Sequence, residues 1–145
     1  YDFFIDMTQK LFLPVNSPPP PPKMPVILPK SKMAYIAWME LLKNFPKTSR
    51  YTLGNNIDQH FLNMLAYVYQ ATYQNPTEKI NTIIRATGQL DMAKFLLSVA
   101  WEGKIMANNQ YVKISADLDE IGRMLGGWKK GIEKTLESKN STIYK

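Results

Sequence analysis

The sequence predicts an all-α protein: an antiparallel up-down four-helix bundle with an extended proline-rich amino-terminal arm. From residue 31 onward, apolar residues recur at spacings of three and four, the period of one helix face. Four such stretches are joined by short segments rich in turn and capping residues, which is typical of neighbouring antiparallel helices. We therefore divide the chain into an arm or docking segment at 1–30, a bundle at 31–138 and a polar tail at 139–145.

The arm is marked by consecutive prolines at Pro18–Pro22, with Pro14, Pro25 and Pro29 nearby. Proline has no backbone N–H and a fixed φ, so this stretch is expected to be an extended polyproline-type strand. It is either a solvated spacer or a docking strap. An apolar cluster ahead of it favours docking of some part of residues 1–13; its members are Tyr1, Phe3, Phe4, Ile5, Leu11, Phe12 and Leu13. Because the chain begins at Tyr1 and not at Met, we expect its natural start to lie upstream.

The first predicted helix follows Ser31, a plausible N-cap, and stops before Pro46. Its apolar stripe is Ala34, Trp38, Leu41, Leu42 and Phe45. Residues 45–50 form a short connection to the second helix. The stripe of that helix is Leu53, Ile57, Phe61, Leu65, Val68 and Thr72. Asn75-Pro76-Thr77 then breaks the chain, and Thr77 is the expected cap of the third helix.

The third helix is expected to end near Gly103, with Asn108 and Asn109 in the following turn. Its apolar residues are Ile80, Ile83, Ile84, Leu90, Leu97 and Trp101. The fourth helix has the most regular pattern of the chain, which predicts a seam that packs against other helices. We call these residues the fourth-helix seam: Tyr111, Ile114, Leu118, Ile121, Leu125, Trp128, Ile132 and Leu136.

Net charge, the absence of cysteine and the lack of long apolar runs limit the kinds of function that the chain can have. Lys and Arg number 18 against 12 Asp and Glu, a formal charge of +6 that favours polyanionic partners such as nucleic acid. The absence of cysteine excludes disulfides, thiolate metal sites and cysteine nucleophiles. No apolar run is long enough to span a membrane, and the amino terminus lacks the layout of a signal peptide. A cytoplasmic protein with no membrane role is the expectation.

The titratable residues do not assemble a recognisable active site. The single histidine, His60, has no oriented carboxylate or further ligands at helical spacing, and we interpret it as a structural or surface residue. Asp117, Asp119 and Glu120 are interpreted as the solvated face of the fourth helix. We therefore predict no catalytic residues, no metal and no cofactor.

The fourth helix also contains three glycines within six residues, Gly122, Gly126 and Gly127. Each costs about 1 kcal/mol relative to alanine inside a helix, so a compensating close approach of another helix is expected, within the bundle or across a subunit boundary. They are not a phosphate-binding loop, because they interrupt a helical stripe and do not follow a strand. Arg123, placed on the seam side, is expected to be a structural or interface group.

The segment Asp119-Glu120-Ile121-Gly122-Arg123-Met124-Leu125-Gly126-Gly127-Trp128, preceded by Phe45-Pro46-Lys47 and Arg50-Tyr51-Thr52-Leu53-Gly54, resembles the accessory variability determinant (Avd) proteins of diversity-generating retroelements. The resemblance covers about residues 33–136. These proteins are similar to four-helix proteins encoded in intervening sequences of large-subunit ribosomal RNA genes. The proline-rich arm lies outside the resemblance.

The resemblance implies a homopentamer that binds the retroelement reverse transcriptase and the template-repeat RNA and supports mutagenic reverse transcription without catalysing it. Packing residues in the motif are Gly122, Arg123, Gly126, Gly127 and Trp128. The candidate RNA contacts are Lys43, Lys47, Arg50, Lys79, Arg85, Lys94, Lys129, Lys130 and Lys134. The alternative is an oligomeric helical adaptor whose basic surface binds an acidic protein, with no nucleic-acid role.

Overall fold

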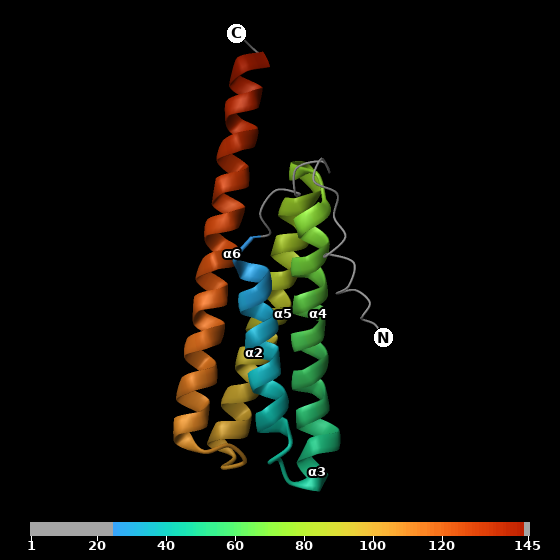
Figure 1. Cartoon of the computed structure of the whole chain (residues 1–145), viewed down its shortest axis with the longest axis vertical. Coiled ribbons are helices and arrows are strands. Elements are labelled where there is room, and N and C mark those ends of the chain that lie inside the picture. Colours follow the sequence, from blue (N-terminus) through green and yellow to red (C-terminus); the bar gives the residue numbers. More distant parts are fainter. Residues whose placement is uncertain (1–24, 144–145) are drawn as a thin grey trace, which may run out of the picture.

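The computed structural model describes residues 25–143, which form a four-helix bundle with up-down connections (Figure 1). Its long helices are α2 (Ile27–Leu42), α4 (Asn55–Tyr73), α5 (Pro76–Glu102) and α6 (Asn108–Ile143). A short helix, α3 (Lys47–Ser49), and one turn of π-helix, η1 (Arg50–Gly54), lead directly into α4. The described part contains no strand. The all-α, antiparallel bundle is therefore confirmed.

Two predicted helix starts were wrong. Ser31 lies inside α2, which begins at Ile27 because Ile27 and Leu28 are buried against the core. Pro29 is compatible with this start, since N–H groups of the first helical turn have no intrahelical partner. The start of α5 is capped by Asn75, whose Oδ1 accepts a 3.0 Å hydrogen bond from the Glu78 N–H, with Pro76 in the first turn. Thr77 is already helical.

The core is a single apolar cluster to which all four long helices contribute. Trp38 of α2 is fully buried and lies between Phe45 and Phe61. The fourth-helix seam is fully buried from Ile114 to Leu125. From Trp128 upward it is only half-buried. The seam therefore packs as predicted from Ile114 to Leu125, and its later residues are only partly covered by the other helices.

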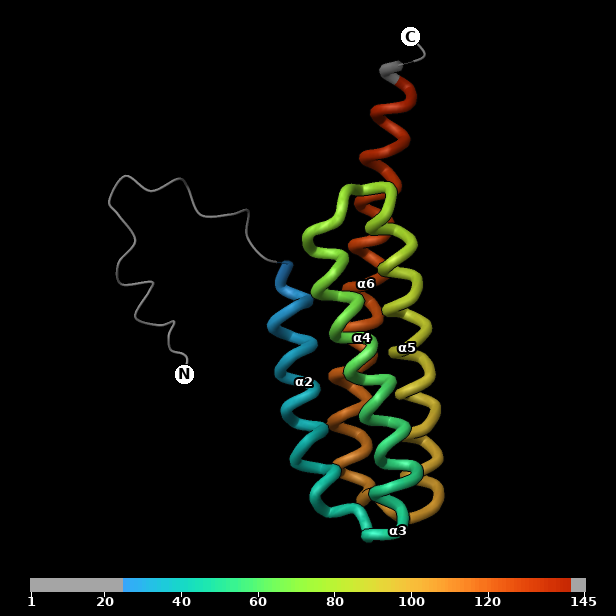
Figure 2. The backbone as a smooth tube through the Cα atoms, turned by 90° about the vertical axis from the view of Figure 1, so that its right-hand side faces the viewer, coloured from blue at the N-terminus to red at the C-terminus, as the bar shows by residue number. Residues whose placement is uncertain are grey.

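The seam is less buried from Trp128 onward because the helices differ in length. α2 has 16 residues, whereas α6 has 36 and rises past the ends of the other helices (Figures 1 and 2). Residues 139–143, expected to be part of a polar tail, continue this helix. The proposed docking of residues 1–13 lies outside the described residues.

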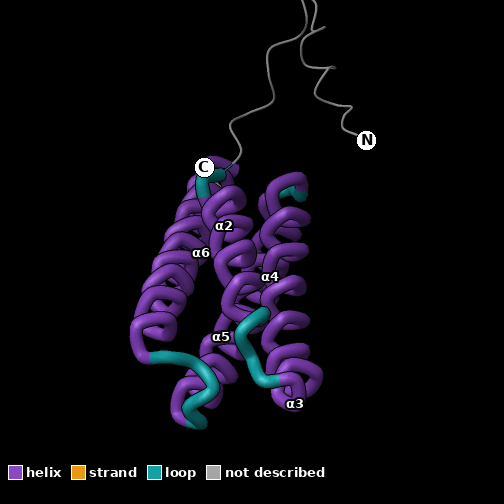
Figure 3. The backbone as a smooth tube through the Cα atoms, turned by 60° about the horizontal axis from the view of Figure 1, so that its bottom comes forward, coloured by secondary structure: helices purple, strands orange, loops and turns teal. Residues whose placement is uncertain are grey.

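The end of the bundle opposite the C-terminal end of α6 holds two tight connections (Figure 3). Between α2 and α3, the Arg50 guanidinium closes the end of α2 by donating from Nη2 to the carbonyls of Lys43 (3.2 Å) and Phe45 (3.0 Å). Between α5 and α6, Gly103 ends α5 as expected and Lys104 adopts a left-handed φ of 62°. The expected turn residues Asn108 and Asn109 already belong to α6.

Candidate nucleic-acid interface

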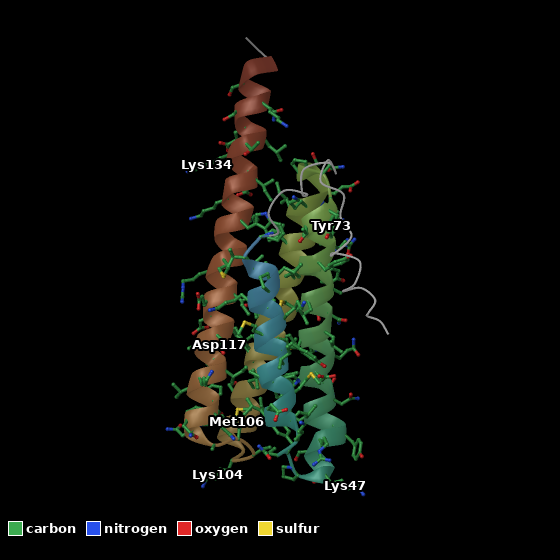
Figure 4. The ribbon with its side chains drawn as sticks, viewed as in Figure 1. Lys47, Tyr73, Lys104, Met106, Asp117 and Lys134 are labelled. Carbon is green, nitrogen blue, oxygen red and sulfur yellow. The ribbon has the colours of Figure 1, made fainter. Side chains whose placement is uncertain are left out.

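The projecting part of α6 carries the most accessible group of predicted cations. Lys130 and Lys134 are exposed, and no carboxylate of the described residues lies within ion-pairing distance of either. Lys129 is half-buried and pairs with Glu133 at 3.5 Å. Figure 4 shows Lys134 on the upper part of α6, about level with the upper ends of α4 and α5. A polyanion could reach this segment from several sides.

The cations of α5 are more heavily engaged. Lys79 places its ammonium 5.6 Å from the ring centroid of Trp128, within cation–π range, and so ties the start of α5 to the upper part of α6. Lys94 pairs with Asp119 at 2.7 Å. Arg85 is exposed. Of these three, Lys79 lies next to the α6 cations, and the charge of Lys94 is already paired with the Asp119 carboxylate.

The third predicted group lies at the far end of the molecule, where Figure 4 shows Lys47 at the foot of α4. Lys47 is exposed, but Lys43 pairs with Glu40 at 2.8 Å and Arg50 holds two backbone carbonyls. A single chain therefore does not gather the nine predicted cations into one patch. Their assignment as RNA contacts stays a prediction.

The motif glycines are not equivalent. A Cβ at Gly122 would stand 3.4 Å from Leu90 Cδ2, an ordinary van der Waals contact with α5. A Cβ at Gly126 or Gly127 would have no described atom outside its own helical turn within 4 Å, and the same is true of Gly131. Among these glycines only Gly122 has a neighbouring helix in the described residues, and any partner for Gly126 has to come from outside them.

Gly126→Leu is accordingly expected to leave the fold of the single chain intact. Loss of the helical glycine should add about 1 kcal/mol of helix stability. Thermal melting by circular dichroism, with light scattering for the molar mass, measures the two effects separately. A lower mass with a melting temperature that is retained or raised is expected if a second chain packs against Gly126; a lower melting temperature at unchanged mass would contradict the open space around this glycine.

Arg123 does not lie on the seam side, and that placement was wrong. It is exposed, because the buried stripe runs through Leu118, Ile121 and Leu125, and Arg123 follows Ile121 by two residues, roughly half a turn away. Its role in assembly remains a prediction.

Two of the three predicted surface acids of α6, Asp119 and Glu120, are held in ion pairs. Asp119 pairs with Lys94, and Glu120 pairs with Lys30 at 2.8 Å. The Lys30 hydrogen bond lowers the pKa of Glu120, and the same contact raises the pKa of Lys30. Asp117 lies half-buried nearby, in the lower half of α6 (Figure 4). Among residues 25–143 no three His, Asp or Glu side chains are grouped as metal ligands.

His60 has a structural partner. Its Nδ1 lies 2.8 Å from Gln89 Oε1, an oxygen that also accepts a 3.1 Å hydrogen bond from Asn63 Nδ2. This cluster joins α4 to α5.

No described helix combines the length and the apolar character that crossing a membrane requires.

Sequence reasoning missed a polar site at the base of α2 and α4. Asp58 Oδ1 accepts hydrogen bonds from Tyr35 Oη (2.8 Å) and from Trp38 Nε1 (3.0 Å). Burial, reinforced by this hydrogen bond to Asp58, raises the pKa of Tyr35 to about 12. Arg50, Tyr35 and Asp58 line one pocket. The only sequence signal for this site was the segment from Arg50 to Gly54, which carries part of the family resemblance.

Comparison with known proteins supports the fold and the family. Among solved structures, one similar chain is a protein of unknown function from the S23 ribosomal protein family of Bacteroides thetaiotaomicron. It superposes with a TM-score of 0.67 at 20% identity, covering 72% of this chain and 96% of that one. The comparison with curated proteins gave no match. Residues 26–132 match the family described as bAvd-like. This match spans the bundle from the start of α2 through the glycine motif of α6, and the chain belongs to the bAvd-like family.

Proposed function

We propose that this protein is a non-catalytic accessory factor that binds a reverse transcriptase and its template RNA and supports mutagenic reverse transcription. Membership of the bAvd-like family is the observation that carries the proposal. The accessible cations on the projecting part of α6 supply a surface with the charge that RNA binding requires.

Assembly would strengthen that surface. In a homopentamer, which the family resemblance implies, five copies of Lys130 and Lys134 would surround one axis or one rim. Several weak phosphate contacts on one assembly act at high effective concentration, so repetition compensates for the modest charge of each chain. Lys79 and Lys129 would contribute less, because Trp128 and Glu133 already engage them.

Changing Lys129, Lys130 and Lys134 together to Glu is expected to weaken RNA binding at low salt by roughly an order of magnitude or more. The dependence of affinity on salt should flatten too, because each phosphate contact on a single strand contributes about 0.7 to the logarithmic slope. Filter binding at two salt concentrations measures both quantities.

A matched control is available in the same chain. Lys32, Lys104 and Lys113 are exposed and were not among the predicted contacts. Changing these three to Glu alters the net charge by the same amount, so retained binding here would show that position matters as well as total charge. Equal loss in both variants, or no loss in either, would remove α6 as the RNA site. Capture of an acidic protein in place of RNA would favour the adaptor alternative.

A further inference from the structure

A pocket of about 380 Å³ opens between α2 and α4 at the end of the bundle opposite Lys134. Its lining residues are Tyr35, Met39, Leu42, Lys43, Arg50 and Asp58. Met39 and Leu42 supply an apolar wall, while the other four carry polar or charged groups. The volume exceeds that of a single aromatic heterocycle, so a planar ring of that size fits inside.

Arg50 is fixed in this pocket before any ligand arrives. It begins the π-helical turn, a rare element that is found frequently at functional sites. Nη2 is anchored by two carbonyls, and the enclosed Nε has no partner among the described residues. Nη1 makes no hydrogen bond within the described residues and is not enclosed, so it remains available as a donor. Buried donors without partners are uncommon in native proteins and call for an explanation.

Asp58 supplies the complementary acceptor. Both of its hydrogen bonds within the described residues are made by Oδ1, from Tyr35 and Trp38. These two donors hold the carboxylate in one orientation. Oδ2 makes no hydrogen bond to a described residue and is not enclosed. The pocket therefore presents a fixed acceptor and a fixed donor beside an apolar wall.

These features discriminate among ligands. An inorganic phosphate carries net negative charge and would face the negative charge of Asp58. A purely apolar ligand would take water from Arg50 and Asp58 without replacing its hydrogen bonds, which is costly. A nucleobase with an exocyclic amine has an apolar ring, a donor for a carboxylate and an adjacent acceptor for a guanidinium.

We propose that the pocket bounded by Arg50 and Asp58 accepts one unpaired nucleobase bearing an exocyclic amine, held against Met39 and Leu42, with its phosphate near Lys43. The proposal rests on the proposed RNA-binding function and places a base-reading site away from the α6 cations. Unpaired bases of single-stranded RNA are the ones whose edges proteins read in this way.

Cytidine and uridine monophosphates test it, because cytosine presents an amine at C4 beside an acceptor at N3, whereas uracil presents a carbonyl at C4 beside an N–H donor at N3. The Trp38 indole N–H donates to Asp58, so its NMR resonance in the full-length protein reports on the pocket. We expect cytidine monophosphate to shift this resonance. We also expect it to bind about fivefold or more tighter than uridine monophosphate, which is the difference in affinity that roughly one hydrogen bond makes.

Met39→Trp should block the pocket from its rim, because Met39 is 45% exposed and can be enlarged without filling the core. Met33→Trp is the matched control: it lies on the same helix, is 70% exposed and does not line the pocket. The cytidine-induced shift should disappear in Met39→Trp and persist in Met33→Trp, with both proteins melting like the parent.

Equal affinities for the two nucleotides, or a shift that survives in Met39→Trp, would overturn the assignment. Failure of the two proposals is distinguishable. RNA retained on filters without any response of the Trp38 signal to cytidine monophosphate removes only the pocket; a specific nucleotide response in a protein that retains no RNA removes only the RNA-accessory function.

Discussion

Replacing Trp38 with Ala is expected to lower the free energy of unfolding by about 3–5 kcal/mol, the range for removing a large buried aromatic side chain. Trp38 is 0% exposed. Its ring stacks on Phe61 at a centroid distance of 6.5 Å and meets the edge of Phe45 at 5.5 Å. Its Nε1–H also anchors Asp58, so the substitution removes packing and one hydrogen bond together.

Urea denaturation at one fixed protein concentration measures this effect, because oligomerisation would otherwise link stability to concentration. Trp101→Ala is the matched control. Trp101 stacks on Tyr111 with a centroid distance of 4.7 Å but remains 38% exposed, so we expect a loss of about 1–2 kcal/mol. Comparable losses at both positions would show that Trp38 is not the centre of the core.

Gly54→Leu is the second large effect, an expected loss of about 1–3 kcal/mol from overpacking. A Cβ at Gly54 would stand 2.6 Å from Leu42 Cδ1, 3.3 Å from Phe45 Cδ2 and 3.4 Å from the Ser49 carbonyl oxygen. The Leu42 side chain could move aside, but the rest of the new side chain would still press on the buried connection that carries Phe45. The end of the π-helical turn therefore favours a residue with little or no side chain.

Gly88→Leu provides the comparison for Gly54→Leu. Gly88 is a helical glycine with open space around it, so the gain in helix propensity, about 1 kcal/mol, should appear without a clash. Chemical denaturation of both variants should give changes of opposite sign. Stabilisation at both positions would mean that Leu42 and Phe45 repack freely.

The site was harder to predict than the fold. Charge and position along the helix identified nine cations, but the structure shows Lys43, Lys94 and Lys129 paired with carboxylates and Arg50 holding carbonyls. The pairs Glu40–Lys43 and Lys129–Glu133 lie at the i,i+3 and i,i+4 spacings that a sequence shows, whereas the pair Lys94–Asp119 joins two helices, so linear spacing does not reveal it. Asp58, Tyr35 and Trp38 were not recognised as one network for the same reason.

By itself the sequence determined the fold class and the order of the four helices, because helix periodicity and chain breaks act over a few residues. The family resemblance came from the motif around the α6 glycines and not from periodicity. Tertiary structure decided where α2 begins, since burial of Ile27 and Leu28 outweighed the capping preference of Ser31. It also decided that α6 outruns the bundle and leaves Gly126 without a neighbour among the described residues, because the length of a helix does not reveal how far its neighbours extend. The pocket beside Arg50 exists only through the contact of two helices and a π-helical turn, and a pattern within one helix carries no information about it.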